Sequence, residues 1–425
     1  MLLQLLQRHF FIFYDMEKQE LIPNLFRSEY QKIVSVLVRL FGIAEIETAE
    51  DIVSDTFLSA TEVWSTRGLP ENPTAWLYTV AKNKTKNHLK RDKLFQDKLS
   101  PEIQYLAATT EEFEIDLSAK NIGDSQLAMI FTVCNPQISS ESQVALALNL
   151  LCGFGIQEIA DAYLTNKEVV YKRLKRAKAK LKDVNVRIEQ PGLTEISERL
   201  NTVLTTLYLL FSEGYYSTSK NTILRRDFCA EAMRLVYLLA SQEQTNLPNV
   251  NALLSLMCFH VSRFDARANS DGEVILYHDQ DESLWDHQMI EQGKHYLGLS
   301  ASGNQLTKFH LEAAIAYWHT HKEDLPEKWL GILHLYNNLL IVEYSPIVAL
   351  NRTYALAKVE GKAAAIIEAE KLNLSDNQFY YSLLGNLYTG INDMIALDHY
   401  KQAMVLANTD TDRLIITKHI QNLQG

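Results

Sequence analysis

The chain has 425 residues, of which 47% are hydrophobic and 22% are charged, and its formal net charge is −11. This length is too great for one ordinary hydrophobic core, so two or three domains are expected. The acidic balance excludes a protein that coats nucleic acid with its whole surface, so any DNA contact must come from local basic patches. Four cysteines lie far apart without a CxxC pair. They indicate neither a zinc site nor a disulfide framework, and they fit a reducing cytoplasm.

Residues 1–22 are interpreted as a leader that precedes the folded part of the chain. The segment MLLQLLQRHFFIFYD is apolar, but Arg8 and His9 interrupt it, and it is too short to span a bilayer. It also lacks a small-residue cleavage site after a basic start, unlike a secretory signal. We expect this leader to be disordered, with Met16 as an alternative start, and we expect no association with a membrane.

Residues 23–95 form a first compact unit, in which the best-marked helix is the second. This helix is expected to begin with Thr48 as its cap and Asp51 three residues on, and to bury one continuous apolar face as far as Trp64. Its outer face carries the carboxylates of Asp51 and Asp55. For an anonymous helix, such acids are most simply a solvated face with favourable charge near the N-terminus.

The third helix of this unit, TAWLYTVAKNKTKNHLKRDK, starts apolar and ends basic. Asn83 and Asn87 stand there among lysines and an arginine, a mixture that suits a phosphate backbone and splayed-out bases. An acidic and polar linker, residues 96–123, follows this helix.

Residues 124–188 contain two amphipathic helices joined by a tight turn, with Asn166 as a good N-cap for the second. One face of the second helix is apolar and lysines and arginines cover the rest, a pattern that buries one side and offers cations on the other. This is the pattern of a helix-turn-helix, whose second helix usually enters the major groove of DNA. A solvated basic helix on an ordinary bundle is the alternative. The expected buried stripe consists of Val170, Leu174, Ala177 and Leu181.

Residues 189–425 are rich in Leu, Ala and Tyr and poor in Gly and Pro, which predicts helices throughout. The end of this segment resembles a tetratricopeptide repeat. Aromatic residues and alanines at this spacing are more often packing between helices than a ligand site, but stacked repeats form concave surfaces. A protein or peptide partner is therefore the default expectation. The matching residues are Tyr381, Leu384, Gly385 and Tyr388 in one helix and Ala396, Tyr400 and Ala403 in the next.

Two polar clusters raise the question of an enzyme, one as an acid/base or Ca²⁺ site and one as a metal site. The first comprises Asp279, Asp281 and Asp286, and the second comprises His310, His319 and His321. The histidines lack the i, i+4 spacing that places two imidazoles on one helical turn, and no HExxH motif is present. We interpret these side chains as caps and hydrogen bonds between helices, and we predict no catalytic residue, metal or cofactor.

Three segments in this order resemble bacterial RNA polymerase sigma factors of the extracytoplasmic-function (ECF) type. Residues 49–64 resemble the core-binding helix of sigma region two, residues 72–93 its promoter-melting and minus-10 helix, and residues 141–182 region four. Segments further on, such as residues 201–217 and 279–293, resemble the subgroup with a large helical C-terminal extension. The implied fold is all-α, with two small sigma domains, the second a helix-turn-helix, followed by a tetratricopeptide-like domain.

The resemblance implies a non-enzymatic cytoplasmic protein that binds core RNA polymerase and promoter DNA and directs promoter-specific initiation, with a regulatory extension. The alternative is a helix-turn-helix regulator that acts without core polymerase and uses the repeats as a sensor, which leaves residues 49–93 without a role. The implied core-binding residues are Asp51, Ile52, Asp55 and Phe57. Those implied for the minus-10 element are Asn83, Lys84, Asn87, Lys90 and Arg91, and those for the minus-35 element are Lys167, Glu168, Tyr171, Lys172, Arg173 and Arg176.

Overall fold

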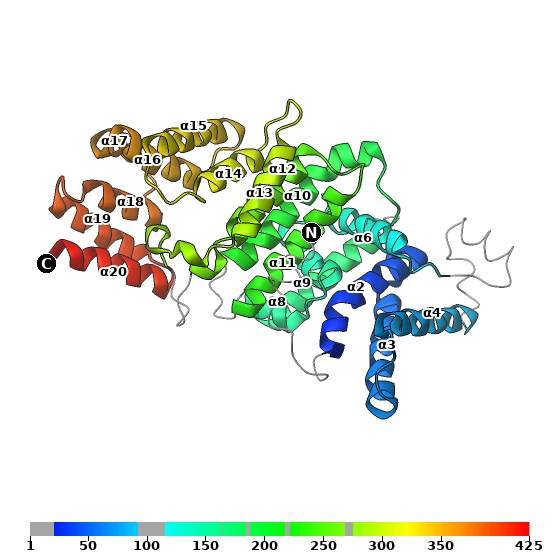
Figure 1. The fold of residues 1–425 in the computed structure, drawn as a ribbon. Coiled ribbons are helices and arrows are strands. Elements are labelled where there is room, and N and C mark those ends of the chain that lie inside the picture. The colour runs from blue at the N-terminus through cyan, green and yellow to red at the C-terminus, as the bar shows by residue number, and fades with distance from the viewer. Residues whose placement is uncertain are drawn as a thin grey trace. The chain divides into compact units, whose positions relative to one another are not determined.

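The computed structural model of the protein describes residues 21–91, 115–163, 165–183, 188–216, 222–267 and 275–424. These residues form helices and connecting turns, and no strand occurs among them, which confirms the all-α prediction. The chain divides into two compact units, unit 1 (residues 1–246) and unit 2 (residues 247–425), each considered by itself below (Figure 1). Residues 1–20 of the expected leader and 96–114 of the expected linker lie outside the described residues.

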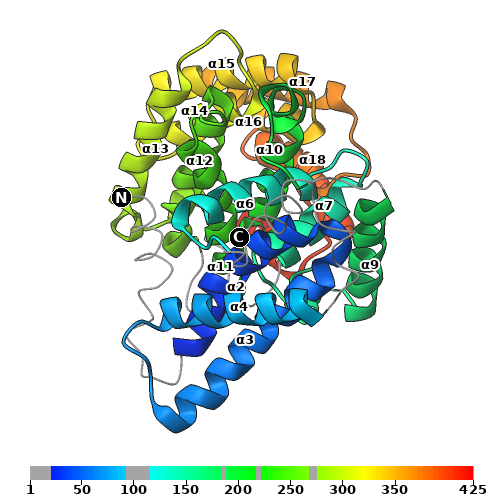
Figure 2. The ribbon, with the colours of Figure 1, turned by 90° about the vertical axis from the view of Figure 1, so that its right-hand side faces the viewer.

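Unit 1 begins with three helices that share a core (Figure 2). They are α2 (Leu21–Phe41), α3 (Ile46–Arg67) and α4 (Pro73–Arg91), with the short turn η1 (Ile43–Glu45) between the first two. Gly42 ends α2 with a positive φ of 89°, which glycine adopts without steric cost. The prediction that Thr48 caps α3 is wrong, because the helix already begins at Ile46, whose side chain is fully buried. Thr48 lies in the first turn, and its hydroxyl donates to Glu45 Oε2 at 3.0 Å.

The middle of unit 1 holds the predicted pair of helices. Its elements are α6 (Ala119–Val133), α7 (Ser140–Leu146), the wider π turn η3 (Ala147–Leu151), α8 (Ile156–Ala162) and α9 (Lys167–Asp183). α6 starts before residue 124, the expected start of this domain, because the Ser118 hydroxyl caps it by accepting from the Asn121 N–H. Gly153, with a φ of 79°, allows the chain to turn from η3 into α8.

Two long helices, α10 (Leu193–Tyr215) and α11 (Thr222–Ser241), complete unit 1. They pack against each other and contact α6. The Thr206 hydroxyl on α10 donates to Gln143 Oε1 on α7 at 2.7 Å, and Arg234 Nη2 on α11 donates to the Leu151 carbonyl at 3.0 Å. The compact unit therefore continues past residue 188, where the helix-turn-helix domain was expected to end.

Unit 2 is a succession of helices in which neighbours along the chain pack together. The helices are α12 (Pro248–Val261), α13 (His287–Ser300), α14 (Lys308–Trp318), α15 (Pro326–Val342), α16 (Pro346–Glu360), α17 (Lys362–Leu372), α18 (Gln378–Tyr388), α19 (Asp393–Leu406) and α20 (Asp410–Gln424). Three short turns, η4 (Phe264–Ala266), η5 (Tyr277–Asp279) and η6 (Glu282–Leu284), lie between α12 and α13.

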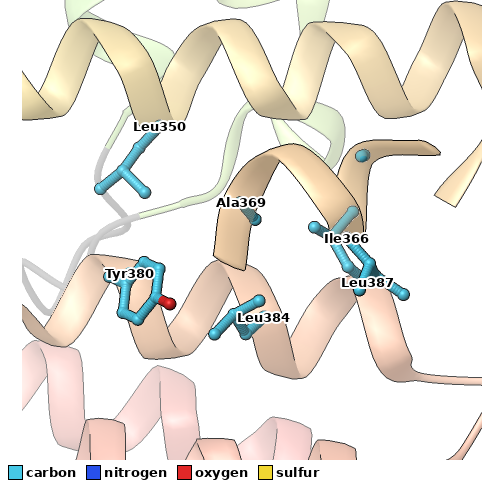
Figure 3. Packing of buried hydrophobic residues seen from close by; sticks show 7 residues of the cluster. Leu350, Ile366, Ala369, Tyr380, Leu384 and Leu387 are labelled. Carbon is cyan, nitrogen blue, oxygen red and sulfur yellow. The ribbon is translucent and has the colours of Figure 1, made fainter. Parts of the chain in front are cut away.

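The repeat-like residues at the end of unit 2 pack between helices, as the sequence predicts. Figure 3 shows one buried cluster, in which Leu350 of α16 and Ile366 of α17 face Leu384 of α18. On the other side of α18, a Cβ at Gly385 would lie 2.9 Å from the Tyr400 ring of α19. Only glycine lets these two helices approach so closely, and this accounts for two members of the repeat pattern.

Candidate nucleic-acid interface

Helix α9 has the local features of the second helix of a helix-turn-helix. The Asn166 side chain caps it, since Oδ1 accepts from the Glu168 N–H at 2.8 Å. The predicted stripe is confirmed, because all four of its members are buried, and α9 packs against α7 and α8. This packing fixes which side of α9 faces outward. The buried members are Val170, Leu174, Ala177 and Leu181.

The outward side of α9 carries five of the six residues predicted to address DNA. These five are exposed: Lys167, Glu168, Tyr171, Lys172 and Arg176. Arg173, the sixth, is half-buried, and its guanidinium lies 3.4 Å from the Glu141 carboxylate. Val169, which the sequence interpretation left out, is 48% exposed in the first turn. An exposed valine is unusual in a packed helix, which generally buries its apolar residues. Val169 is therefore a further candidate for DNA contact, and it could be recognised only once the structure showed which side of α9 faces outward.

The last turns of α9 are engaged with α3. Lys178 Nζ donates to both carboxylate oxygens of Glu50, at 3.0 and 3.1 Å, and Lys182 Nζ donates to Glu47 at 2.6 Å. Partial burial would raise the pKa of Glu47, but the hydrogen bond and charge of Lys182 outweigh it and hold this pKa below its ordinary value. Lys178 and Lys182 of α9 are therefore ion-paired with α3, whereas Lys167, Lys172 and Arg176 are exposed.

The four residues implied for core polymerase lie on two sides of α3. Asp51 and Asp55 are exposed, and Asp55 Oδ2 lies 4.0 Å from Lys84 Nζ of α4. Ile52 and Phe57 are buried, and the Phe57 ring packs edge-on against Phe26 of α2 at 5.1 Å between ring centroids. The acids are thus available to a partner, while Phe57 holds α3 against α2 and Ile52 is buried in the core.

Helix α4 presents part of the residues predicted for the minus-10 element. Asn83 and Asn87 are exposed and lie four residues apart, which places them on one face of the helix, and Lys84 beside them is half-buried. Lys90 and Arg91 belong to the last turn of α4, and their side chains lie outside the described residues. Exposed amides beside cations can hydrogen-bond both bases and phosphates.

Two of the three acids considered as a catalytic or Ca²⁺ site act as caps, and the third, Asp279, lies 3.5 Å from His278 Nε2. Asp281 Oδ1 accepts from the Ser283 N–H at 2.9 Å, and Asp286 Oδ1 accepts from the Met289 N–H at 2.9 Å at the start of α13. Among the described residues, no group of three or more His, Cys, Asp or Glu side chains is placed to hold a metal ion. Within the same part of the chain, every helix is too short or too polar to cross a lipid bilayer.

Comparison with known proteins places two families on the chain. The sigma-70 region 2 family matches residues 25–94, which contain α3 and α4, and a family of unknown function, DUF6596, matches residues 199–301. No solved structure matches significantly.

Two curated relatives cover different lengths of the chain. The uncharacterized protein R00370 of Rhizobium meliloti is 30% identical over 397 residues, which cover 92% of this chain and 93% of that protein. The RNA polymerase sigma factor YlaC of Bacillus subtilis is 27% identical over 168 residues, which cover 39% of this chain and 93% of YlaC. The region 2 match and the likeness to YlaC support the role of a non-enzymatic sigma factor. The chain belongs to the same family as R00370 of Rhizobium meliloti, and its first helices are a sigma-70 region 2.

Proposed function

We propose that the protein is an RNA polymerase sigma factor of the ECF type, which binds core polymerase through α3 and recognises promoter DNA through α4 and α9. One observation carries the proposal: a sigma-70 region 2 lies in the same compact unit as a capped, half-buried helix whose outward side is cationic. A sigma factor needs both features, since it reads two promoter elements while bound to the polymerase.

The docking step uses the exposed carboxylates of α3. Asp51 and Asp55 lie one helical turn apart and face solvent, so they can meet a basic surface of core polymerase without rearrangement of region 2. Ile52 and Phe57 would contribute indirectly, because their burial in the core fixes the orientation of the helix that carries the acids.

The reading step uses two helices. In α9, residues of the first turn would lie nearest the base edges of the minus-35 element and the later cations nearest phosphates. In α4, the amides would hold the minus-10 strand together with the neighbouring cations. The residues proposed are Lys167, Glu168, Tyr171, Lys172, Arg173 and Arg176 in α9 and Asn83, Lys84, Asn87, Lys90 and Arg91 in α4.

Reading both elements at once requires the ion pairs between α9 and α3 to break. Elements at minus 10 and minus 35 are about 25 base pairs apart, which is roughly 85 Å on B-DNA. In the structure, α9 is bound to Glu50 and α4 contacts Asp55 through Lys84, and these two acids are five residues apart on α3, a rise of roughly 7.5 Å. The two reading helices are therefore too close together, and we propose that this compact form opens on core polymerase.

Run-off transcription with purified core polymerase tests the proposed function. The full chain should give a promoter-dependent transcript, and the same chain with Asp51 and Asp55 both changed to Lys should give none. Promoter binding without any core-dependent transcript would instead favour a helix-turn-helix regulator that acts alone.

The helical extension is proposed to be needed for activity, through contacts with a protein or peptide partner. The compact unit ends at Asn246 rather than at residue 188, and α10 and α11 cover α6. A truncated chain should therefore end at Asn246, because a cut near residue 188 would expose the core of unit 1. If the chain of residues 1–246 folds and transcribes as well as the full chain, unit 2 is dispensable for initiation.

A further inference from the structure

A cluster of aromatic and cationic side chains in unit 2 has no role in the proposed function. The turn after α12, the short turns η5 and η6, the end of α14 and the first turn of α15 meet around one tyrosine ring. We call this group the Tyr277 cluster. Its members are Arg263, Tyr277, Gln280, Trp285, His319 and Lys328.

The Tyr277 ring is the centre of the cluster. Trp285 stacks on it at 6.3 Å between ring centroids, and His319 meets it edge-on at 5.1 Å. The guanidinium carbon of Arg263 lies 5.4 Å from the ring centroid and Lys328 Nζ lies 5.1 Å from it. Two cations therefore share one aromatic ring.

Both cations are buried, and neither forms an ion pair with a carboxylate among the described residues. Arg263 is 9% exposed and Lys328 is 2% exposed. Lys328 Nζ donates to the Tyr277 hydroxyl at 3.1 Å and to the His321 carbonyl at 2.6 Å, and both acceptors are neutral. Burying an unpaired charge costs several kcal/mol at least. A structure with two such cations needs a negative charge from elsewhere.

The acid that acts most strongly on Lys328, Asp324, is already engaged. Asp324 accepts from Lys358 Nζ at 2.9 Å and from the indole N–H of Trp329. The hydrogen bond from Lys358, helped by that of Trp329, lowers the pKa of Asp324 below its ordinary value. Its charge is therefore shared with Lys358. Burial lowers the pKa of Lys328 below its ordinary value, and the charges of Asp324 and Glu282 offset this only in part.

The cluster contains several buried polar atoms without a hydrogen-bond partner among the described residues, and one of them, Gln280 Oε1, is an acceptor. Arg263 Nε, Trp285 Nε1 and His319 Nδ1 are buried and have no hydrogen-bond partner within the described part of the chain. The first two can only donate, and a neutral imidazole can donate at this nitrogen. Buried polar atoms almost always have a partner. A water molecule would satisfy such donors, but it would not balance the two positive charges.

The pKa of His319 also reflects the positive charges of the cluster. Burial, reinforced by the charges of Arg263 and Lys328, lowers the pKa of His319 to about 3. The imidazole is therefore neutral near pH 7, and it can donate one hydrogen bond without adding a third charge to the cluster.

We propose that the Tyr277 cluster binds the oxyanion of a small molecule, a carboxylate or a phosphate. Its oxygens would accept from Arg263 and Trp285, and its charge would balance Arg263 and Lys328. A small ligand is required, because Trp285 is only 4% exposed and a macromolecular surface would not reach it. Tyr277 and His319 are the half-buried members of the cluster, so a ligand would enter past these two rings.

The proposed anion site would give a chemical role to part of the segment that matches the DUF6596 family. Four of the six members, from Arg263 to Trp285, lie within residues 199–301, the range that this family matches. The proposal is independent of the sigma-factor assignment, since no part of it depends on core polymerase or DNA.

Thermal unfolding of the full chain tests the site, with sodium phosphate or sodium acetate titrated against chloride at constant ionic strength and pH 7.5. The midpoint of the wild type should rise and saturate, by about 5 to 10 °C at a hundredfold excess over Kd. Arg263→Met, which keeps the aliphatic stem but removes the charge, should show no rise. In chloride alone this variant should be as stable as the wild type or more stable, because an unpaired buried cation has been removed.

Lys371→Met is the control, since it removes an exposed cation of unit 2 whose carboxylate partner, Glu368, lies on its own helix. This variant should keep the anion-dependent rise. A rise with phosphate only would identify a phosphate-bearing ligand, and a rise with acetate only a carboxylate. The proposal is overturned if the wild type shows no saturable rise with either anion, or if Arg263→Met rises as the wild type does.

A second measurement does not depend on stability. The indole ¹H–¹⁵N signal of Trp285, assigned with Trp285→Phe, should shift on titration of the same anion and should stay fixed in Arg263→Met. A signal that is unmoved in the wild type at saturating anion would contradict the proposed donor.

Discussion

The cations on the outward side of α9 differ in their surroundings from those inside the Tyr277 cluster. Lys172 and Arg176 of α9 are exposed, whereas Arg263 and Lys328 are almost completely buried. Exposed cations interact with water and salt, so each contributes little to folding and offers a screened attraction to a polyanion. Buried cations lack that solvation, so they need a partner of matched charge and geometry.

The difference between these two arrangements shows that a count of charges does not define a binding surface. Exposed lysines and arginines can contact an extended DNA backbone independently of its sequence. Buried ones can bind only a single small anion of matching shape. Exposed charges should therefore affect partners and salt dependence, while buried charges should affect stability and its dependence on pH and ligands. The predictions below test this distinction.

The largest effect is expected from the exposed acids of α3. Changing Asp51 and Asp55 together to Lys should abolish co-purification with core polymerase. The free energy of unfolding should change by less than about 0.5 kcal/mol for each site, because surface charges away from special features contribute little. Circular dichroism during heating measures the stability. Glu62→Lys reverses another exposed acid on α3 and should retain binding. Normal binding by the double variant would exclude these acids from the interface.

The second effect concerns the paired cations at the end of α9. Changing Glu50 to Lys replaces a salt bridge of 3.0 Å with a repulsion. A partly exposed pair contributes about 1 kcal/mol, so the opening equilibrium should shift roughly fivefold towards separation of α9 from α3. Spin labels on α3 and α9 would measure the distance between the helices. Adding Lys178→Glu reverses the pair and should restore the short distance, and a double variant that stays open would contradict the proposed ion-pair contact.

The features that were predictable from the sequence are local. The buried stripe of α9 follows from apolar residues at helical spacing, and Asn166 was identified as a cap from its position alone. The start of α3 was not predictable in this way, because Ile46 is drawn into the helix by burial in a core built from several helices. Ile52 and Phe57 were placed at an interface by family resemblance, and the structure adds that they are buried.

The features that were missed depend on contacts between residues far apart in the chain. Glu50 and Lys178 are separated by 128 positions, and no local pattern links them. In the same way, the Tyr277 cluster draws single residues from five segments. The polar residues around it were interpreted as caps and as hydrogen bonds between helices, and for Asp286 this is confirmed. Lys328 and Arg263 gave no signal, since an isolated cation in a sequence is most often exposed.

A smaller effect is expected from single cations in the first turns of α9. Arg176 is exposed, and replacing it by Ala should remove one phosphate contact and lower the slope of log K against log salt by about 0.9. Arg173 is half-buried beside Glu141, so its replacement by Ala should lower the slope by less, because part of its charge is already balanced. Fluorescence anisotropy with promoter DNA between 50 and 200 mM salt, roughly the range over which such contacts are lost, measures both. Equal slopes in both variants and the wild type would exclude this helix as the DNA-binding element.

The smallest effect concerns His319 in the Tyr277 cluster, where folding disfavours the protonated form of the imidazole. Its folded pKa is about 3 and its unfolded pKa is close to 6.5. Between these values the unfolded chain binds more protons, so stability is fully present above pH 6.5 and falls as the pH decreases. From pH 7 to pH 5.5 the loss should be about 1 kcal/mol.

His319→Phe keeps an aromatic ring against Tyr277 and removes the titration, so its stability should fall less over the same range. His260, whose pKa burial also holds well below its ordinary value, accounts for part of the remaining loss. His295→Phe replaces an exposed histidine on α13 and should keep the full dependence of the wild type. Unfolding in urea at the two pH values, in buffers free of phosphate and carboxylate, measures the difference. If His319→Phe and the wild type lose the same free energy, the imidazole of His319 is not kept neutral by the folded cluster.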